Sequence, residues 1–167
     1  DIAHPDVTPV QDGCELTRVA LDFANCLRAY RPQIVRGEPG FSVSIALLEG
    51  DRPVVAALFN PLTDEMFVAA EGQGATLNGE CIMAPPTCAL GGCGMILRPE
   101  MHARLGAHPG WPKTRLLTPM PNSIAYRVAL VAAGRWDAAI GLGKTNDWDV
   151  AAAVLILAVS ECSYRLV

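Results

Sequence analysis

The sequence has few charged residues and no apolar run long enough to cross a membrane. Only 18% of its 167 residues are charged, and 13 Lys and Arg stand against 17 Asp and Glu, which gives a net charge of −4. Such a chain has no electrostatic reason to bind a nucleic-acid backbone or an anionic membrane. The longest apolar run, residues 150–159, is half of the roughly 20 residues that a membrane helix needs, so it predicts a buried helix. No charged stretch followed by an apolar one opens the chain, and we expect no signal peptide.

The cysteines also lack the spacing of zinc sites and disulfide frameworks. None of the six forms a C-x-x-C pair, and no histidine stands at zinc-finger distance from the closest two, Cys88 and Cys93. Scattered cysteines in a chain of this size favour reduced thiols, so we expect a cytoplasmic protein. Hydrophobic residues make up 51% of the chain, which excludes a disordered or fibrous class.

The first half of the chain predicts one helix followed by strands. Residues 1–13 have two prolines and no periodicity and predict an arm, which leaves residues 14–167 as a single domain. Apolar residues spaced three and four apart predict an amphipathic helix over 15–30 that Pro32 ends. An antiparallel meander is expected over 41–82, with strands at 41–48, 54–59, 66–70 and 75–77 and a hairpin turn at Asn78-Gly79.

The second half mixes short strands with two strong helices. Asn122 or Ser123 is a good N-cap for a helix that Gly134 ends, and an apolar run follows Asp147 in the last helix. Strands followed by helices with short connections predict a layered α/β domain rather than a strict βαβ alternation. The expected strands are 95–97, 115–118 and 136–140, and the expected helices are 99–105, 122–133 and 147–159.

The most distinctive polar cluster stands at the start of the last helix. Asn146, Asp147 and Asp149 precede an almost wholly apolar segment, with the aromatic Trp148 between the acids. In one interpretation Asn146 is the N-cap and Asp149 reaches back to it in a capping box, with the helix dipole favouring the negative charge. In the other, Asp149 is an oxygen ligand for Mg²⁺, whose sites use one or two carboxylates with water and substrate phosphate.

Other candidate motifs are weaker. Lys144-Thr145 after Gly143 resembles the end of a nucleotide-binding P-loop, but Ala138 occupies the place of its first glycine. The serines Ser42, Ser44 and Ser123 lack the G-x-S-x-G context of a nucleophile and are explained by strand and cap positions.

Four segments carry a more specific pattern. Residues 37–47 read GEPGFSVSIAL, and residues 60–79 contain NPLTDEMF and GQGATLNG. Residues 122–137 read NSIAYRVALVAAGRWD, and residues 148–153 read WDVAAA. In this order and spacing they resemble the inositol monophosphatase family over about residues 35–161, roughly three quarters of the chain.

This resemblance implies an αβαβα sandwich and a Mg²⁺-dependent phosphomonoesterase, in which metal-activated water attacks phosphorus. By position, Asp149 would bind a metal, and Asn122, Ser123 and Ile124 would line the substrate pocket. The resemblance also implies a homodimer, a small phosphorylated substrate and inhibition by Li⁺. The stretch T-N-x-W-D-x-A-A is similar to the 3′(2′),5′-bisphosphate nucleotidase branch, and residues 140–144 contain no acid of the inositol-specific kind. A nucleotide or a broad range of phosphate monoesters is therefore favoured over inositol phosphate.

The sequence departs from the family where metal ligands are expected. The motif D-P-[IL]-D-G-T should precede Gly37, but residues 27–33 contain no carboxylate, and the upstream glutamate motif is missing too. One carboxylate does not hold two or three Mg²⁺ ions. Either the chain is an inactive, phosphatase-like interaction or regulatory module, or segments of a longer protein are missing near residues 31–36, 80–95 and 159–164. We expect the second.

Overall fold

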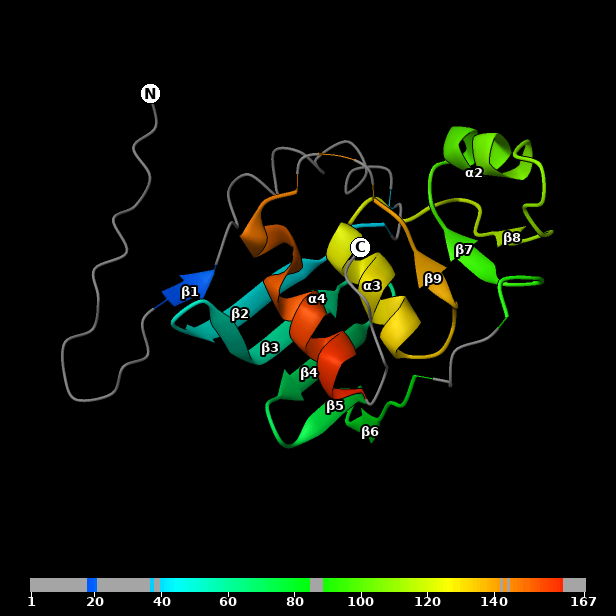
Figure 1. Ribbon diagram of the computed structural model, residues 1–167. Helices are drawn as coiled ribbons and strands as arrows, with labels where there is room; N and C mark the ends of the chain where they lie inside the picture. Colours follow the sequence, from blue (N-terminus) through cyan, green and yellow to red (C-terminus); the bar gives the residue numbers. More distant parts are fainter. Residues whose placement is uncertain are drawn as a thin grey trace, which may run out of the picture.

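The computed structural model describes residues 18–20, 37, 40–84, 89–141, 143 and 145–160 (Figure 1). These residues form two sheets and three helices. The predicted arm over 1–13, most of the predicted helix over 15–30 and the proposed break near 31–36 lie outside the described residues, as do parts of the proposed breaks near 80–95 and 159–164. The proposal that segments are missing stays a prediction.

The first sheet has six antiparallel strands in the order β1-β2-β3-β4-β5-β6. The Asn78-Gly79 turn has positive φ angles of 50° and 83°, the conformation that a tight two-residue hairpin requires and that this residue pair favours. The predicted meander is confirmed. The strands are β1 (Arg18–Ala20), β2 (Val43–Glu49), β3 (Arg52–Asn60), β4 (Glu65–Ala70), β5 (Gly74–Leu77) and β6 (Glu80–Cys81).

Strand β1 corrects the helix predicted over residues 15–30. Its three residues pair with β2, with Val19 opposite Leu47 and Ala20 opposite Ala46. Local spacing of apolar residues predicts a helix here, but a free strand edge offers backbone hydrogen bonds that the local pattern does not encode. The prediction was wrong for residues 18–20, and the rest of that segment is not described.

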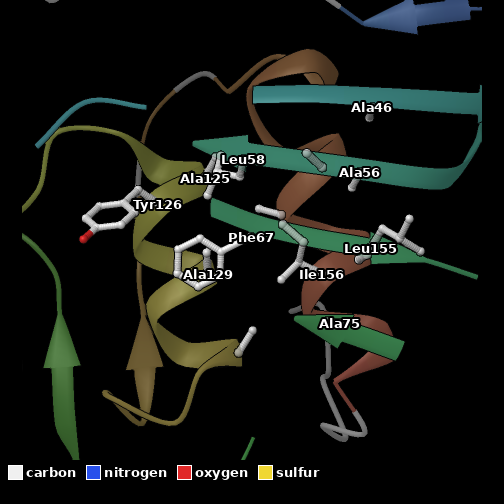
Figure 2. Close-up of a cluster of buried hydrophobic side chains, with 14 of the residues drawn as sticks. Ala46, Ala56, Leu58, Phe67, Ala75, Ala125, Tyr126, Ala129, Leu155 and Ile156 are labelled. Carbon is white, nitrogen blue, oxygen red and sulfur yellow. The ribbon is translucent and has the colours of Figure 1, made fainter. Parts of the chain in front are cut away.

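Helices α3 (Ile124–Ala132) and α4 (Asp147–Val159) pack side by side on one face of the first sheet (Figure 1). Leu58, Phe67 and Ile156 are completely buried between them and the sheet. Figure 2 shows that alanines fill much of this layer, which lets the helices approach the strands closely. The helix predicted over 147–159 has the same bounds in the structure, and α3 begins two residues later than predicted.

The second sheet has three parallel strands in the order β8-β7-β9 and is covered on both faces. Ile96 of β7 packs in the core with α3, whereas Met95 and Leu97 pack with Met101 of the short helix α2. All three β7 residues are buried, as is typical of a parallel strand between two layers. The elements are β7 (Gly94–Ile96), β8 (Arg115–Leu116), β9 (Ala138–Ala139) and α2 (Pro99–Gly106).

The described residues therefore form four successive layers: the first sheet, the pair α3 and α4, the second sheet and α2. This order confirms the layered α/β class and fits four layers of the expected αβαβα sandwich. None of the described helices has both the length and the hydropathy of a membrane-spanning helix.

Candidate active site

The N-terminus of α3 carries the three residues predicted to line a substrate pocket. Ser123 is the N-cap, and its hydroxyl accepts a hydrogen bond of 3.2 Å from the backbone N–H of Tyr126. The Ser123 residue is only 6% exposed. Asn122 is exposed, and Ile124 is partly buried. Of the three, Asn122 has the side chain most open to a ligand.

Residues 40–42 are bound tightly to this helix start. The Ser42 and Ser123 hydroxyl oxygens lie 2.7 Å apart, and the Ser123 N–H donates to the Gly40 carbonyl at 2.7 Å. A Cβ atom at Gly40 would lie 2.9 Å from the Asn122 nitrogen, closer than real Cβ contacts allow. Glycine is therefore required at position 40, because the backbone there passes directly against the backbone of residues 121–122, just before α3.

Arg127 holds the loop that leads into α3. Its guanidinium donates to the Pro121 carbonyl at 2.6 Å and to the Asn122 carbonyl at 2.8 Å. The residue is 8% exposed. A planar group with several donors can satisfy two neighbouring carbonyls at once, so Arg127 fixes the path of residues 121–122.

A second polar network ties α3 to the first sheet. Tyr126, in the first turn of α3, donates its hydroxyl to the Glu65 carboxylate, and Arg135 and Thr63 donate to the same group. Burial alone would raise the pKa of Glu65, but these hydrogen bonds and the Arg135 charge outweigh it and hold that pKa below its ordinary value. Burial, and then the bond to Glu65, raises the pKa of Tyr126. Glu65 is thus an ionised anchor between β4 and α3.

Among the described residues, the hydrogen bonds at the N-terminus of α4 join Asn146 to Asp149. Asp149 accepts from the Asn146 backbone N–H at 3.0 Å and from the Asn146 side-chain amide at 3.3 Å, both through Oδ2. This is the carboxylate half of the predicted capping box. Within the described part of the chain, Oδ1 accepts no hydrogen bond. Asn146, Asp147 and Trp148 are exposed.

The described residues do not by themselves fit a Mg²⁺ centre. Mg²⁺ takes six oxygen ligands, and a protein site supplies one or two carboxylates with waters and substrate phosphates. Within the ranges that the structure describes, no group of three His, Cys, Asp or Glu side chains is arranged to hold a metal. Asp149 offers one carboxylate, already engaged through Oδ2, so we derive no reaction step through a metal.

The segment before α4 reaches the wall formed by α3. A Cβ atom at Gly141 would lie 3.0 Å from Cδ1 of Ile124, so the backbone at 141 runs against that side chain. Three stretches distant in sequence therefore come together: residues 40–42, residues 121–124 and Gly141, which leads into the α4 N-terminus. Lys144 of the partial P-loop pattern lies outside the described residues.

Comparison with known protein families and sequences identifies relatives of this chain. The sequence pattern of the inositol monophosphatase family matches residues 33–160. The chain belongs to the inositol monophosphatase family. "Nus factor SuhB" of Xylella fastidiosa is 35% identical over 129 residues, which cover 74% of this chain and 46% of that protein. Inositol monophosphatase 2 of Solanum lycopersicum is 35% identical over 133 residues, 74% of this chain and 49% of that protein.

Solved structures of inositol monophosphatases share the fold. The "IMPase" of Thermotoga maritima superposes with a TM-score of 0.63 at 26% identity, over 78% of this chain and 51% of that chain. Inositol monophosphatase from Anabaena (Nostoc) sp. PCC 7120 gives a TM-score of 0.59 at 28% identity, over 77% and 55%. The αβαβα class is confirmed. This inositol monophosphatase family chain spans about half the length of the curated relatives it matches.

Sequence reasoning missed two features of the site. Its spacing rules gave no sign that the buried Arg127 holds two loop carbonyls. It also gave no role to Glu65, which meets Arg135 across 70 positions of sequence. The one available signal was the segment NPLTDEMF, in which Glu65 stands within the family pattern.

Proposed function

We propose that this chain belongs to a phosphatase that hydrolyses small phosphate monoesters, a 3′-phosphoadenosine-type nucleotide or an inositol phosphate, with Mg²⁺ as cofactor. In this proposal Asp149 is one metal ligand, and further carboxylates come from outside the described residues. Asn122 and Ile124 line the substrate side. Ser123 holds that wall in place, because its hydroxyl is buried and already bonded.

The observation that carries the proposal is the meeting of residues 40–42, 121–124 and 141 at the start of α3, in a chain whose family is established. Exposed Asn122 gives this region a group that can contact a sugar or a base. The contacts of Gly40, Ser42 and Arg127 fix the wall before any ligand arrives, which reduces the ordering cost of binding.

The test is release of inorganic phosphate by the chain, with Mg²⁺, from adenosine 3′,5′-bisphosphate, inositol 1-phosphate and fructose 1,6-bisphosphate. We expect release from the nucleotide at the highest kcat/KM, and inhibition by Li⁺ by analogy with the family. Chelation of the metal should abolish release. Absence of release from all three substrates by the folded chain would contradict the proposal.

A second function is favoured by one specific observation. Because the described residues contain no metal-binding cluster, a chain that folds and binds phosphate monoesters without hydrolysing them would be an inactive, phosphatase-like interaction or regulatory module. Binding of inorganic phosphate or adenosine 3′,5′-bisphosphate by calorimetry, together with no phosphate release, separates this function from the first.

A further inference from the structure

A buried polar network joins the first turn of α3 to the turn between β3 and β4. The Tyr126 hydroxyl donates to the Glu65 carboxylate and shares a second side-chain hydrogen bond with Asn60. Thr63 and Arg135 donate to the same carboxylate. We call these residues the Glu65 network. Burying polar groups costs free energy unless hydrogen bonds satisfy them, and the phosphatase chemistry proposed above uses none of these side chains.

The Glu65 network lies at the end of the first sheet where residues 40–42 enter it. Asn60 pairs with Glu65 in the register of β3 with β4, and Phe59 pairs with Val43, the first residue of β2. Residues 40–42 therefore reach the sheet beside the network, and the same residues contact the start of α3. The network and the start of α3 share one end of the sheet.

A series of hydrogen bonds connects Glu65 to the substrate side of the site, residues 122–124. Tyr126 donates its hydroxyl to Glu65 and its backbone N–H to the Ser123 hydroxyl, at 3.2 Å. The Ser123 hydroxyl in turn lies 2.7 Å from the hydroxyl of Ser42. These residues are at most 8% exposed, so the series runs through the close-packed interior, which transmits displacements. Tyr126 contacts both the carboxylate and the N-cap.

Packing alone does not explain a tyrosine at position 126. Its ring meets the Phe67 ring edge to face, with the centroids 6.3 Å apart, and a phenylalanine would keep that contact. The hydroxyl adds a buried polar group that needs partners, so a phenylalanine would be simpler in a core that only had to be filled. The hydroxyl contributes a directional bond between the first turn of α3 and β4.

We propose that Glu65, acting through the Tyr126 hydroxyl, is a positioning residue that holds residues 122–124 in place for substrate binding. This role rests on the proposed function, since it concerns the binding of the same phosphate monoester. Glu65 itself contacts no substrate atom in this role. Three donors converge on its carboxylate, which fixes the group more firmly than a single bond would. Such a hold matters because a displacement of about 1 Å in a site lowers its efficiency.

The first experiment measures amide hydrogen exchange by NMR in Tyr126→Phe and in a matched control, Ile156→Val. Tyr126→Phe removes one oxygen, and Ile156→Val removes one methylene from a completely buried side chain outside the network. Both changes should lower the melting temperature. In Tyr126→Phe the amides of residues 123 and 126 should exchange about tenfold faster relative to those of α4. In Ile156→Val the amides of α4 should be affected more.

The second experiment measures binding and turnover of adenosine 3′,5′-bisphosphate with Mg²⁺. Tyr126→Phe should raise KM, and the Kd from calorimetry, about three- to tenfold with kcat nearly unchanged, the pattern expected when binding residues move but the reacting groups do not. Ile156→Val should leave both constants unchanged, although it too is less stable. A hydroxyl with a purely structural role would leave both constants unchanged in Tyr126→Phe as well.

If Tyr126→Phe does not fold, Thr63→Val removes another donor to Glu65 and should show the same pattern to a smaller extent. Unchanged exchange at residues 123 and 126, or equal KM and Kd in Tyr126→Phe and the wild type, would overturn the proposal. A wild type that neither binds nor hydrolyses the nucleotide contradicts the proposed function instead, and the exchange rates then decide by themselves whether Glu65 holds residues 122–124.

Discussion

Helices α3 and α4 lie side by side on the same sheet, but their N-termini are held by different contacts. The α3 start is buried and joined to Gly40 and Ser42, more than 80 positions away in sequence. The α4 start is exposed, and the hydrogen bonds that the structure describes there join Asn146 to Asp149. The contacts at the α3 start hold that side of the site in place, whereas the exposed side chains at the α4 start can contact a ligand. We therefore expect changes at α3 to affect folding and changes at α4 to affect function.

The largest effect on folding is expected from Arg127→Ala. It leaves the carbonyls of Pro121 and Asn122 without their donor in a buried loop, and we expect the free energy of unfolding to fall by about 3 kcal/mol. Arg127→Lys, which keeps the charge but not the planar fork, should cost less than the alanine change. Urea unfolding measures both. A loss below about 1 kcal/mol would show that the loop carbonyls are satisfied without Arg127.

Glu65→Gln should cost about 1–2 kcal/mol at neutral pH, because it removes a charged acceptor shared by Tyr126, Thr63 and Arg135. The pKa of Glu65 is lowered in the folded chain, so its contribution is complete above the unfolded value of about 4.3 and is lost as pH falls through the lower folded value.

Urea midpoints of the wild type and Glu65→Gln, measured from neutral to acid pH, check this dependence. The two curves should converge in acid, below the folded pKa. A constant difference between them at all pH values would contradict the assignment of an ionised anchor to Glu65.

Ser123→Ala should lower the stability of the α3 start by less than the changes at Arg127 and Glu65 do. Loss of the N-cap hydroxyl and of its bond to Ser42 should lower the free energy of unfolding by about 1 kcal/mol. Ser123→Thr keeps a hydroxyl and is the control. Thermal unfolding measures both, and an alanine variant as stable as the wild type would mean that the Gly40 contact alone holds this end of α3.

Local structure was predictable where local residues decide it. The bounds of α4 follow from Asn146 as cap and an uninterrupted apolar run, and the hairpin at Asn78-Gly79 follows from a residue pair that favours positive φ. Strand β1 was missed because its partner is the edge of β2, and edge pairing leaves no periodic trace in the paired segment. Short local sequence patterns do not encode contacts that tertiary packing creates.

The candidate site was predictable only in part, for the same reason. The positions of Asn122, Ser123, Ile124 and Asp149 came from resemblance, and the capping interpretation of Asp149 came from helix-start chemistry. The close approach of Gly40 to Asn122 and the contacts of Glu65 with Tyr126 and Arg135 join residues 61 to 82 positions apart in sequence. No spacing rule joins residues at such separations.

The central claim is that the α4 start is the functional end of the site, and one paired measurement tests it. Mg²⁺-dependent phosphate release and thermal unfolding are measured for the wild type, Asp149→Asn and the neighbouring control Asp147→Asn. We predict that Asp149→Asn abolishes release while costing less than about 1 kcal/mol of stability, as expected for an exposed helix start, and that Asp147→Asn keeps both. Equal release by Asp149→Asn and the wild type, or no release by the wild type, would contradict the claim.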